Sequence, residues 1–138
     1  MRRLIALLAI SVATATAFAA SAAAAPPSIQ VVIRHQMRGC HAWSVAGSAF
    51  KSTQTVTTKH GTMLSFMDND IMPHTLVQLS GPKVTLHTPA MGRIGAEASL
   101  RLVAKGRYVF TTKAGEDYTK GSMTMGEDNV LKLIVFVR

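Results

Sequence analysis

Apolar and polar residues alternate along much of the chain after residue 25, and this period is typical of β-strands with one buried face. Eight segments are rich in β-branched and aromatic residues: 28–35, 53–59, 63–67, 75–79, 84–87, 98–103, 107–112 and 129–138. Glycine, proline, asparagine and aspartate stand between most of these segments and predict turns. Seven to eight short strands with regular turns favour an all-β sandwich or barrel, and no nucleotide-binding pattern interrupts them.

Two of the expected connections are short enough to be hairpin turns, at His60-Gly61 and at Lys105-Gly106. The alternation also predicts which side chains face the interior. The expected core consists of Val32, Val56, Leu64, Phe66, Leu76, Val77, Leu100, Leu102, Tyr108, Phe110, Leu133 and Val135. This core accounts for a fold and leaves the function to other residues.

The first 25 residues have a different composition from the rest. Met1-Arg2-Arg3 supplies a positive start, residues 4–25 are almost wholly apolar or small, and Ala22–Ala25 offers cleavage sites before Pro26. These features predict a signal peptide over 1–25, a periplasmic or secreted protein, and one domain over 26–138. A membrane anchor is the alternative, since about 20 residues span a bilayer. Small residues near the cleavage point favour the signal peptide, so we expect no membrane span after its removal.

Charge and cysteine content narrow the function classes. Removing residues 1–25 takes away two of fifteen basic residues, which leaves thirteen against seven acidic ones and a formal charge of +6. The basic residues stand singly, which argues against nucleic acid binding and favours an acidic partner or an anionic envelope. Cys40 is the single cysteine of the chain, so an internal disulfide and a four-cysteine metal site are excluded. No hydrolase motif is present, and we expect no enzymatic activity.

Soft metal ligands stand in three places. Cys40 and His41 are adjacent in a predicted connection, His74 follows Pro73 at the start of a strand, and Met123 lies in a long polar segment. Thiolate, imidazole and thioether together are the ligands that copper prefers. The alternative interpretation is structural: a buried cysteine, a strand-end histidine and a core methionine. Trp43 either shields such a site or fills the core.

The chain resembles the cupredoxins in two stretches. One is Gly61-Thr62-Met63-Leu64-Ser65-Phe66-Met67-Asp68-Asn69-Asp70 with Met72-Pro73-His74-Thr75-Leu76-Val77; the other is Lys105-Gly106-Arg107-Tyr108-Val109-Phe110 with the closing strand 129–137. The resemblance to this plastocyanin- and azurin-type family covers residues 50–138. It implies a Greek-key β-sandwich and a mononuclear copper held by two histidines, a cysteine and often a methionine, with His74 as the first histidine.

The sequence departs from the family at the end of the second stretch. Thr111-Thr112 stands where the family has its cysteine, and no histidine follows residue 87. We therefore expect an atypical member with one copper ion per chain. Its predicted ligands are Cys40, His41, His74 and Met123, and Met125, Glu116 or Asp117 are alternatives for the last. The backbone would have to turn at Cys40-His41 for both to bind one ion.

Two functions remain open from the sequence. One is an exported copper protein that transfers electrons or carries copper, with an acidic redox or copper-trafficking protein as its partner. The other is a metal-free sandwich that acts as an interaction module in the cell envelope. A measurement of copper binding would distinguish these two functions.

Overall fold

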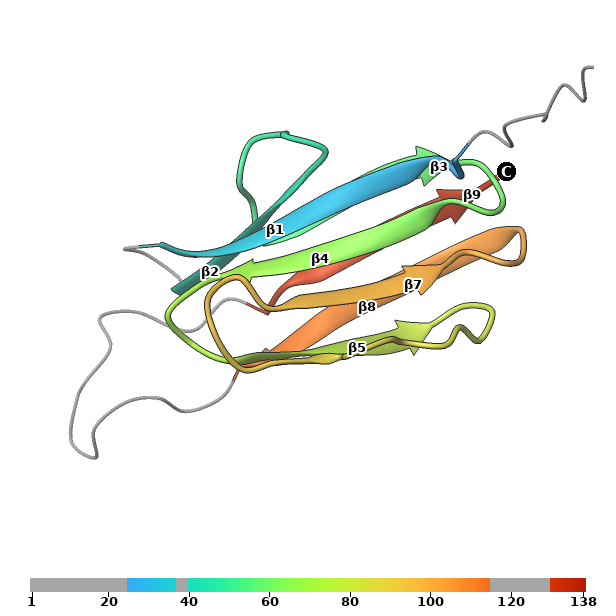
Figure 1. The fold of residues 1–138 in the computed structure, drawn as a ribbon. Coiled ribbons are helices and arrows are strands. Elements are labelled where there is room, and N and C mark those ends of the chain that lie inside the picture. Colours follow the sequence, from blue (N-terminus) through green and yellow to red (C-terminus); the bar gives the residue numbers. More distant parts are fainter. Residues whose placement is uncertain (1–24, 37–39, 115–129) are drawn as a thin grey trace, which may run out of the picture.

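The computed structural model describes residues 25–36, 40–114 and 130–138, which form a two-layered β-sandwich (Figure 1). The described strands are β1 (Ser28–Gln36), β2 (Cys40–Val45), β3 (Thr53–Thr58), β4 (Met63–Asn69), β5 (His74–Ser80), β6 (Ala90–Met91), β7 (Glu97–Arg101), β8 (Gly106–Ala114) and β9 (Lys132–Val137). Among these residues no helix has the length and apolarity that a membrane crossing requires. The prediction of an all-β sandwich is confirmed.

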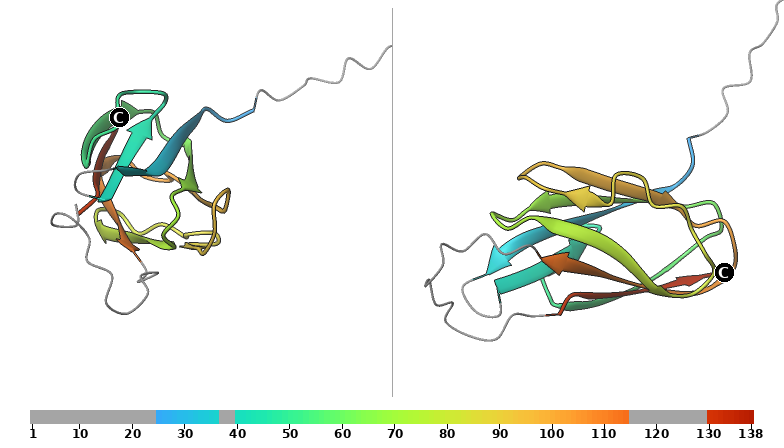
Figure 2. Two further views of the ribbon diagram at one scale, coloured as in Figure 1. Left: turned by 90° about the vertical axis from the view of Figure 1, so that its left-hand side faces the viewer. Right: turned by 90° about the horizontal axis from the view of Figure 1, so that it is seen from below.

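The strands divide into two sheets. The first has the order β2-β1-β4-β7, and the second has the order β3-β9-β8-β5-β6. Neighbours are antiparallel except for β1 with β4 and β3 with β9, which are parallel. Parallel neighbours cannot be joined by a hairpin, so the chain crosses between the two layers. Figure 2 shows the two layers from the end and from below, with the interior between them.

Both predicted hairpins are wrong. The turn at His60-Gly61 joins β3 to β4, and the turn at Lys105-Gly106 joins β7 to β8, yet each pair lies in different sheets. Each of these connections therefore carries the chain from one layer to the other. Both strands of such a pair still place their apolar faces in the shared interior, so alternation alone does not reveal the crossing.

Strand positions also differ from the prediction in the middle of the chain. Segment 84–87 is not a strand, and His87 alone forms a bridge there, with Ser99. Ala90–Met91 forms a short strand instead, and Cys40–Val45, expected as a connection, forms β2. The described part thus has nine strands rather than seven or eight.

The core lies between the sheets and is mostly the predicted one. Leu76 is 2% exposed. Eight other predicted core residues have no exposed surface: Leu64, Phe66, Leu100, Leu102, Tyr108, Phe110, Leu133 and Val135. Val56 is half-buried against this core, and Val32 and Val77 are only half-buried. Val31 and Ile33 fill the place expected for Val32, because β1 pairs with β4 in the register Val31↔Phe66. Trp43 is fully buried beside Phe66, so it is a core residue.

Candidate metal centre

Several strands begin or end at one end of the sandwich, on the left in Figure 1. At this end β1 finishes, β2 begins, β4 passes into β5, and β8 finishes. His41 is the second residue of β2, His74 is the first residue of β5, and Asp70 lies in the connection between β4 and β5. Because β2 belongs to one sheet and β5 to the other, the two layers each contribute one histidine.

The carboxylate of Asp70 stands between the two imidazoles. His41 Nδ1 lies 2.9 Å from Asp70 Oδ2, and His74 Nε2 lies 3.3 Å from the same oxygen. The two rings meet edge to face with centroids 4.7 Å apart. One ligand atom from each of the three residues lies within 4.8 Å of the others. All three side chains are buried, with at most 3% of their surface exposed.

The turn after β4 positions this carboxylate. Asp68 Oδ1 accepts a hydrogen bond from the Asp70 N–H at 3.0 Å, and Asp70 Oδ1 accepts one from the Met72 N–H at 3.0 Å. Aspartate side chains commonly close turns in this way. The neighbouring connection supports the turn, since the Gly95 N–H donates to the Asp68 carbonyl. Asp70 Oδ1 is therefore held by the Met72 N–H, and Asp70 Oδ2 faces His41 and His74.

The two buried aspartates carry opposite pKa shifts. Burial alone would raise the pKa of Asp70, but hydrogen bonds from His41, the Met72 N–H and His74 outweigh burial and lower it. The pKa of Asp68 is raised to about 6, and burial is the largest cause. The hydrogen bond from the Asp70 N–H lowers this pKa, and the charge of Asp70 raises it further. Asp70 therefore ionises at a lower pH than Asp68, and its ionised carboxylate only accepts hydrogen bonds.

Both ring nitrogens of His74 have a polar neighbour. Its Nε2 lies 3.3 Å from Asp70 Oδ2, and its Nδ1 lies 3.0 Å from Thr112 Oγ1. In the tautomer with the proton on Nε2, the ring donates to the carboxylate and accepts from the threonine hydroxyl. Thr112 stands near the end of β8, where the cupredoxin resemblance expects a cysteine. A hydroxyl at this position orients the histidine without offering a thiolate.

The three residues fit a copper ion by their chemistry and spacing. Ligand atoms about 2.0–2.2 Å from one ion lie roughly 3 Å apart at adjacent positions of the tetragonal geometry that Cu(II) favours. The two nitrogen–oxygen distances, 2.9 and 3.3 Å, are close to this separation, and the three ligand atoms all lie within 4.8 Å of one another. Two imidazole nitrogens and a carboxylate oxygen suit Cu(II) better than Cu(I), which favours sulfur. His41, Asp70 and His74 could therefore hold the ion with small side-chain shifts, and Thr112 would orient His74 from behind.

The structure brings together two of the four predicted ligands, His41 and His74. It describes only the backbone of Cys40, which pairs with Gln36 in the β1–β2 ladder. Met123 and its alternatives Met125, Glu116 and Asp117 lie outside the described residues. The prediction did not include Asp70. Its spacing of four residues from His74, within a short turn, was the signal that could have identified it.

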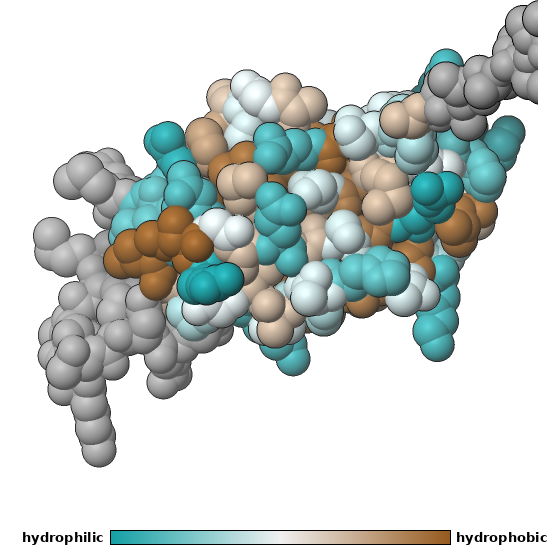
Figure 3. All heavy atoms as spheres, in the orientation of Figure 1, coloured by the Kyte–Doolittle hydropathy of each residue, from teal (hydrophilic) through white to brown (hydrophobic). Residues whose placement is uncertain are grey.

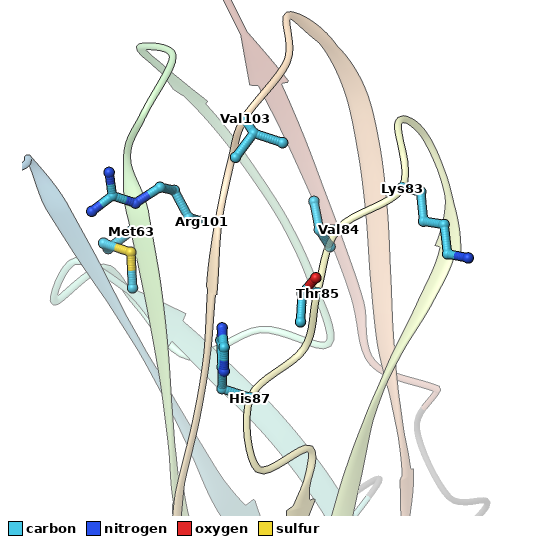
Figure 4. Close-up of a pocket in the computed structure, with 7 residues that line it drawn as sticks. All are labelled: Met63, Lys83, Val84, Thr85, His87, Arg101 and Val103. Atoms are coloured by element: carbon cyan, nitrogen blue, oxygen red, sulfur yellow. The ribbon is translucent and has the colours of Figure 1, made fainter.

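The surface of the described part has a groove and an area of exposed hydrophobic residues. A groove of about 420 Å³ between β7 and segment 83–87 is lined in part by Met63, Lys83, His87 and Arg101 (Figure 4). None of the three clustered residues lines it. Figure 3 shows hydrophobic residues at the end of the molecule where the β4–β5 connection lies, and Ile71 there is 66% exposed. The groove and the buried centre are thus separate features.

Comparisons with known proteins assign this chain to no family: no family model and no curated protein matches it. Among solved structures, an inclusion body protein (PixA) from Burkholderia cenocepacia has a TM-score of 0.46 at 8% identity, covering 83% of this chain and 97% of that one. A Cu-containing nitrite reductase (NirK) from Thermus scotoductus gives 0.42 at 16% identity, covering 83% and 28%. A reduced Cu(I) form of an amicyanin variant gives 0.38 at 12% identity, covering 85% and 86%. Likenesses this weak carry no functional conclusion.

Proposed function

We propose that this protein binds one copper ion at His41, Asp70 and His74 and carries it as Cu(II). The observation that supports the proposal is the contact of two buried imidazole nitrogens with one carboxylate oxygen, at 2.9 and 3.3 Å. Histidine is a very common metal ligand, and an anionic neighbour offsets part of the charge of a divalent ion. A buried carboxylate between two histidines is therefore a favourable place for a cation.

The chain's own residues would hold the ion and control its access. Burial of all three side chains excludes water, which strengthens each electrostatic contact. The Met72 N–H keeps Asp70 in place, and Thr112 keeps the ring of His74 in place. When bound, copper would supply a redox-active cation with an affinity for nitrogen ligands that exceeds that of other divalent first-row metals. Carriage needs tight binding alone, whereas electron transfer would call for a thiolate from Cys40.

Location and partner belong to the same proposal. If the protein is exported, its formal charge of +6 over residues 26–138 favours association with an acidic copper-trafficking or redox protein. The association would weaken as salt concentration rises, because screening shortens the reach of surface charge. The proposal assigns the protein no catalytic step.

The test is a titration of the purified protein with Cu(II), followed by calorimetry and electron paramagnetic resonance. We expect one equivalent bound with nitrogen hyperfine coupling in the wild type. His41→Ala and His74→Ala should each weaken binding by at least about tenfold. The matched control is His87→Ala, since this exposed histidine lies in the groove away from the centre and should leave binding unchanged.

Three results would change or refute the proposal. A strong thiolate-to-copper absorption band that Cys40→Ser abolishes would replace Cu(II) carriage by electron transfer. Unchanged binding in both His41→Ala and His74→Ala would move the ion elsewhere and refute the proposed centre. Absence of stoichiometric binding would refute the copper function altogether.

The metal-free interaction module is the second candidate, and one observation favours it. Both oxygens of Asp70 already accept hydrogen bonds, so the buried carboxylate is satisfied without an ion. The groove beside Lys83 and Arg101 would then supply a cationic binding surface. This candidate predicts that His41→Ala lowers thermal stability and that added copper does not raise the melting temperature of the wild type.

A further inference from the structure

A third histidine reaches the same carboxylate from the outside. His35 lies near the end of β1 and is the direct cross-strand partner of His41 in the β1–β2 ladder. Its Nδ1 lies 3.6 Å from Asp70 Oδ1. The side chain of His35 is 39% exposed, whereas that of Asp70 is 0% exposed and that of His41 is 3% exposed. His35 therefore connects the buried carboxylate with solvent.

The two oxygens of Asp70 face different histidines. Oδ2 contacts the buried pair, His41 and His74, and Oδ1 lies beside the exposed His35. A carboxylate binds a cation through either oxygen, and adjacent positions on its two sides are a short distance apart. An ion held by His35 and Oδ1 would thus reach the buried site by shifting to Oδ2 of the same carboxylate and exchanging His35 for His41 and His74.

We propose that His35 is the entry ligand of the copper site, and this inference rests on the proposed function. His35 Nδ1 and Asp70 Oδ1 capture Cu(II) from solvent, and Asp70 then passes the ion to His41 and His74. The ion keeps its charge throughout. Its bond to His35 breaks as bonds to the buried nitrogens form. Each buried ring releases the proton on its binding nitrogen and takes one up on its other nitrogen, so the net proton count is unchanged.

An entry ligand has a kinetic signature that distinguishes it from a resident ligand. Loss of a resident ligand weakens the equilibrium affinity, mainly through faster release. Loss of an entry ligand raises the barrier in both directions, so loading and release slow by the same factor and the dissociation constant is unchanged. His41 and His74 should show the first behaviour, and His35 should show the second.

Trp43 provides the optical probe for this measurement. It is the single tryptophan of the chain, it is fully buried, and it lies two residues after His41 on β2. Two residues along a strand span about 7 Å, which is close enough for bound Cu(II) to quench the indole fluorescence. Stopped-flow mixing of the whole protein with Cu(II) gives the loading rate, and mixing of the loaded protein with excess chelator gives the release rate.

The variants are His35→Ala and His35→Gln, with His87→Ala as the matched control. His87 is also an exposed histidine, and it lies in the groove away from Asp70. We expect both His35 variants to load and release copper about tenfold more slowly, a barrier increase of about 1.4 kcal/mol. His87→Ala should match the wild type. Glutamine keeps most of the size of the side chain, so it provides the test if the alanine variant does not fold.

Added imidazole gives a second readout. Free imidazole should restore fast loading in His35→Ala, because it can occupy the exposed position beside Asp70. In the same buffer, the loading rate of His87→Ala should not change when imidazole is added. A merely structural role for His35 would not respond to imidazole.

Each result decides between the inference and the proposed function. Wild-type loading rates in both His35 variants would overturn the entry role and leave the copper site intact. Weaker affinity with an unchanged loading rate would make His35 a resident ligand and also overturn it. Failure of the wild type to bind Cu(II) would refute the proposed function itself.

Discussion

The charge of Asp68 should make the stability of the metal-free protein depend on pH. The side chain is fully buried, and its pKa rises from 3.8 to about 6, with burial as the largest cause. A group with a raised folded-state pKa holds its proton more tightly in the folded protein. Its contribution to stability is therefore complete below the unfolded pKa and is lost as the pH rises through the folded one. The window runs from about pH 4 to about pH 6.

The size of the effect follows from the shift. A rise of about two pKa units corresponds to a loss of about 3 kcal/mol in unfolding free energy across this window. Asp68→Asn removes the ionisation and keeps an oxygen that accepts the hydrogen bond from the Asp70 N–H, which is 3.0 Å long in the wild type. The difference in unfolding free energy between Asp68→Asn and the wild type should therefore change by about 3 kcal/mol in favour of the variant as the pH rises.

Urea unfolding in the presence of a chelator measures this difference at intervals from about pH 4 to about pH 7. Glu97→Gln is the matched control, because Glu97 is exposed and removal of its charge should leave the pH profile parallel to that of the wild type. Parallel profiles for Asp68→Asn and the wild type would refute the reasoning. They would mean that Asp68 has the same pKa in the folded and unfolded chains.

Three further predictions concern the core, one turn and the second aspartate. Phe66→Ala should lower the unfolding free energy by about 3–5 kcal/mol, because Phe66 is fully buried. Phe136 is 38% exposed, so Phe136→Ala should lower it by less than half as much, and urea unfolding measures both. Gly81→Ala should lower the melting temperature and Gly92→Ala should not. Gly81 has a φ of 107° and an added Cβ would lie 2.5 Å from a backbone oxygen, whereas Gly92 has open space. Because the pKa of Asp70 is lowered, its contribution is complete above about pH 4 and is lost as the pH falls through the folded value. The wild type should therefore lose stability more steeply in acid than Asp70→Asn, and equal slopes would contradict this.

Local alternation was sufficient to predict several strands and their buried faces. In β4, β7 and β9, buried residues alternate with more exposed ones, as the sequence indicates. His74 also stands where it was expected, at the start of a strand after Pro73. These features depend on the direction of successive side chains along an extended backbone, which a short stretch of sequence determines.

Only the tertiary structure decided which strands pair and which distant side chains meet. In β1 the apolar run allows either face to be buried, and the parallel pairing with β4 selects Val31 and Ile33. The centre joins His41 to Asp70 across 29 residues and His74 to Thr112 across 38. Alternation reports only which face of a strand is apolar. The choice of neighbouring strands depends on burial summed over both sheets, so the carboxylate between the two histidines is a property of the folded sandwich.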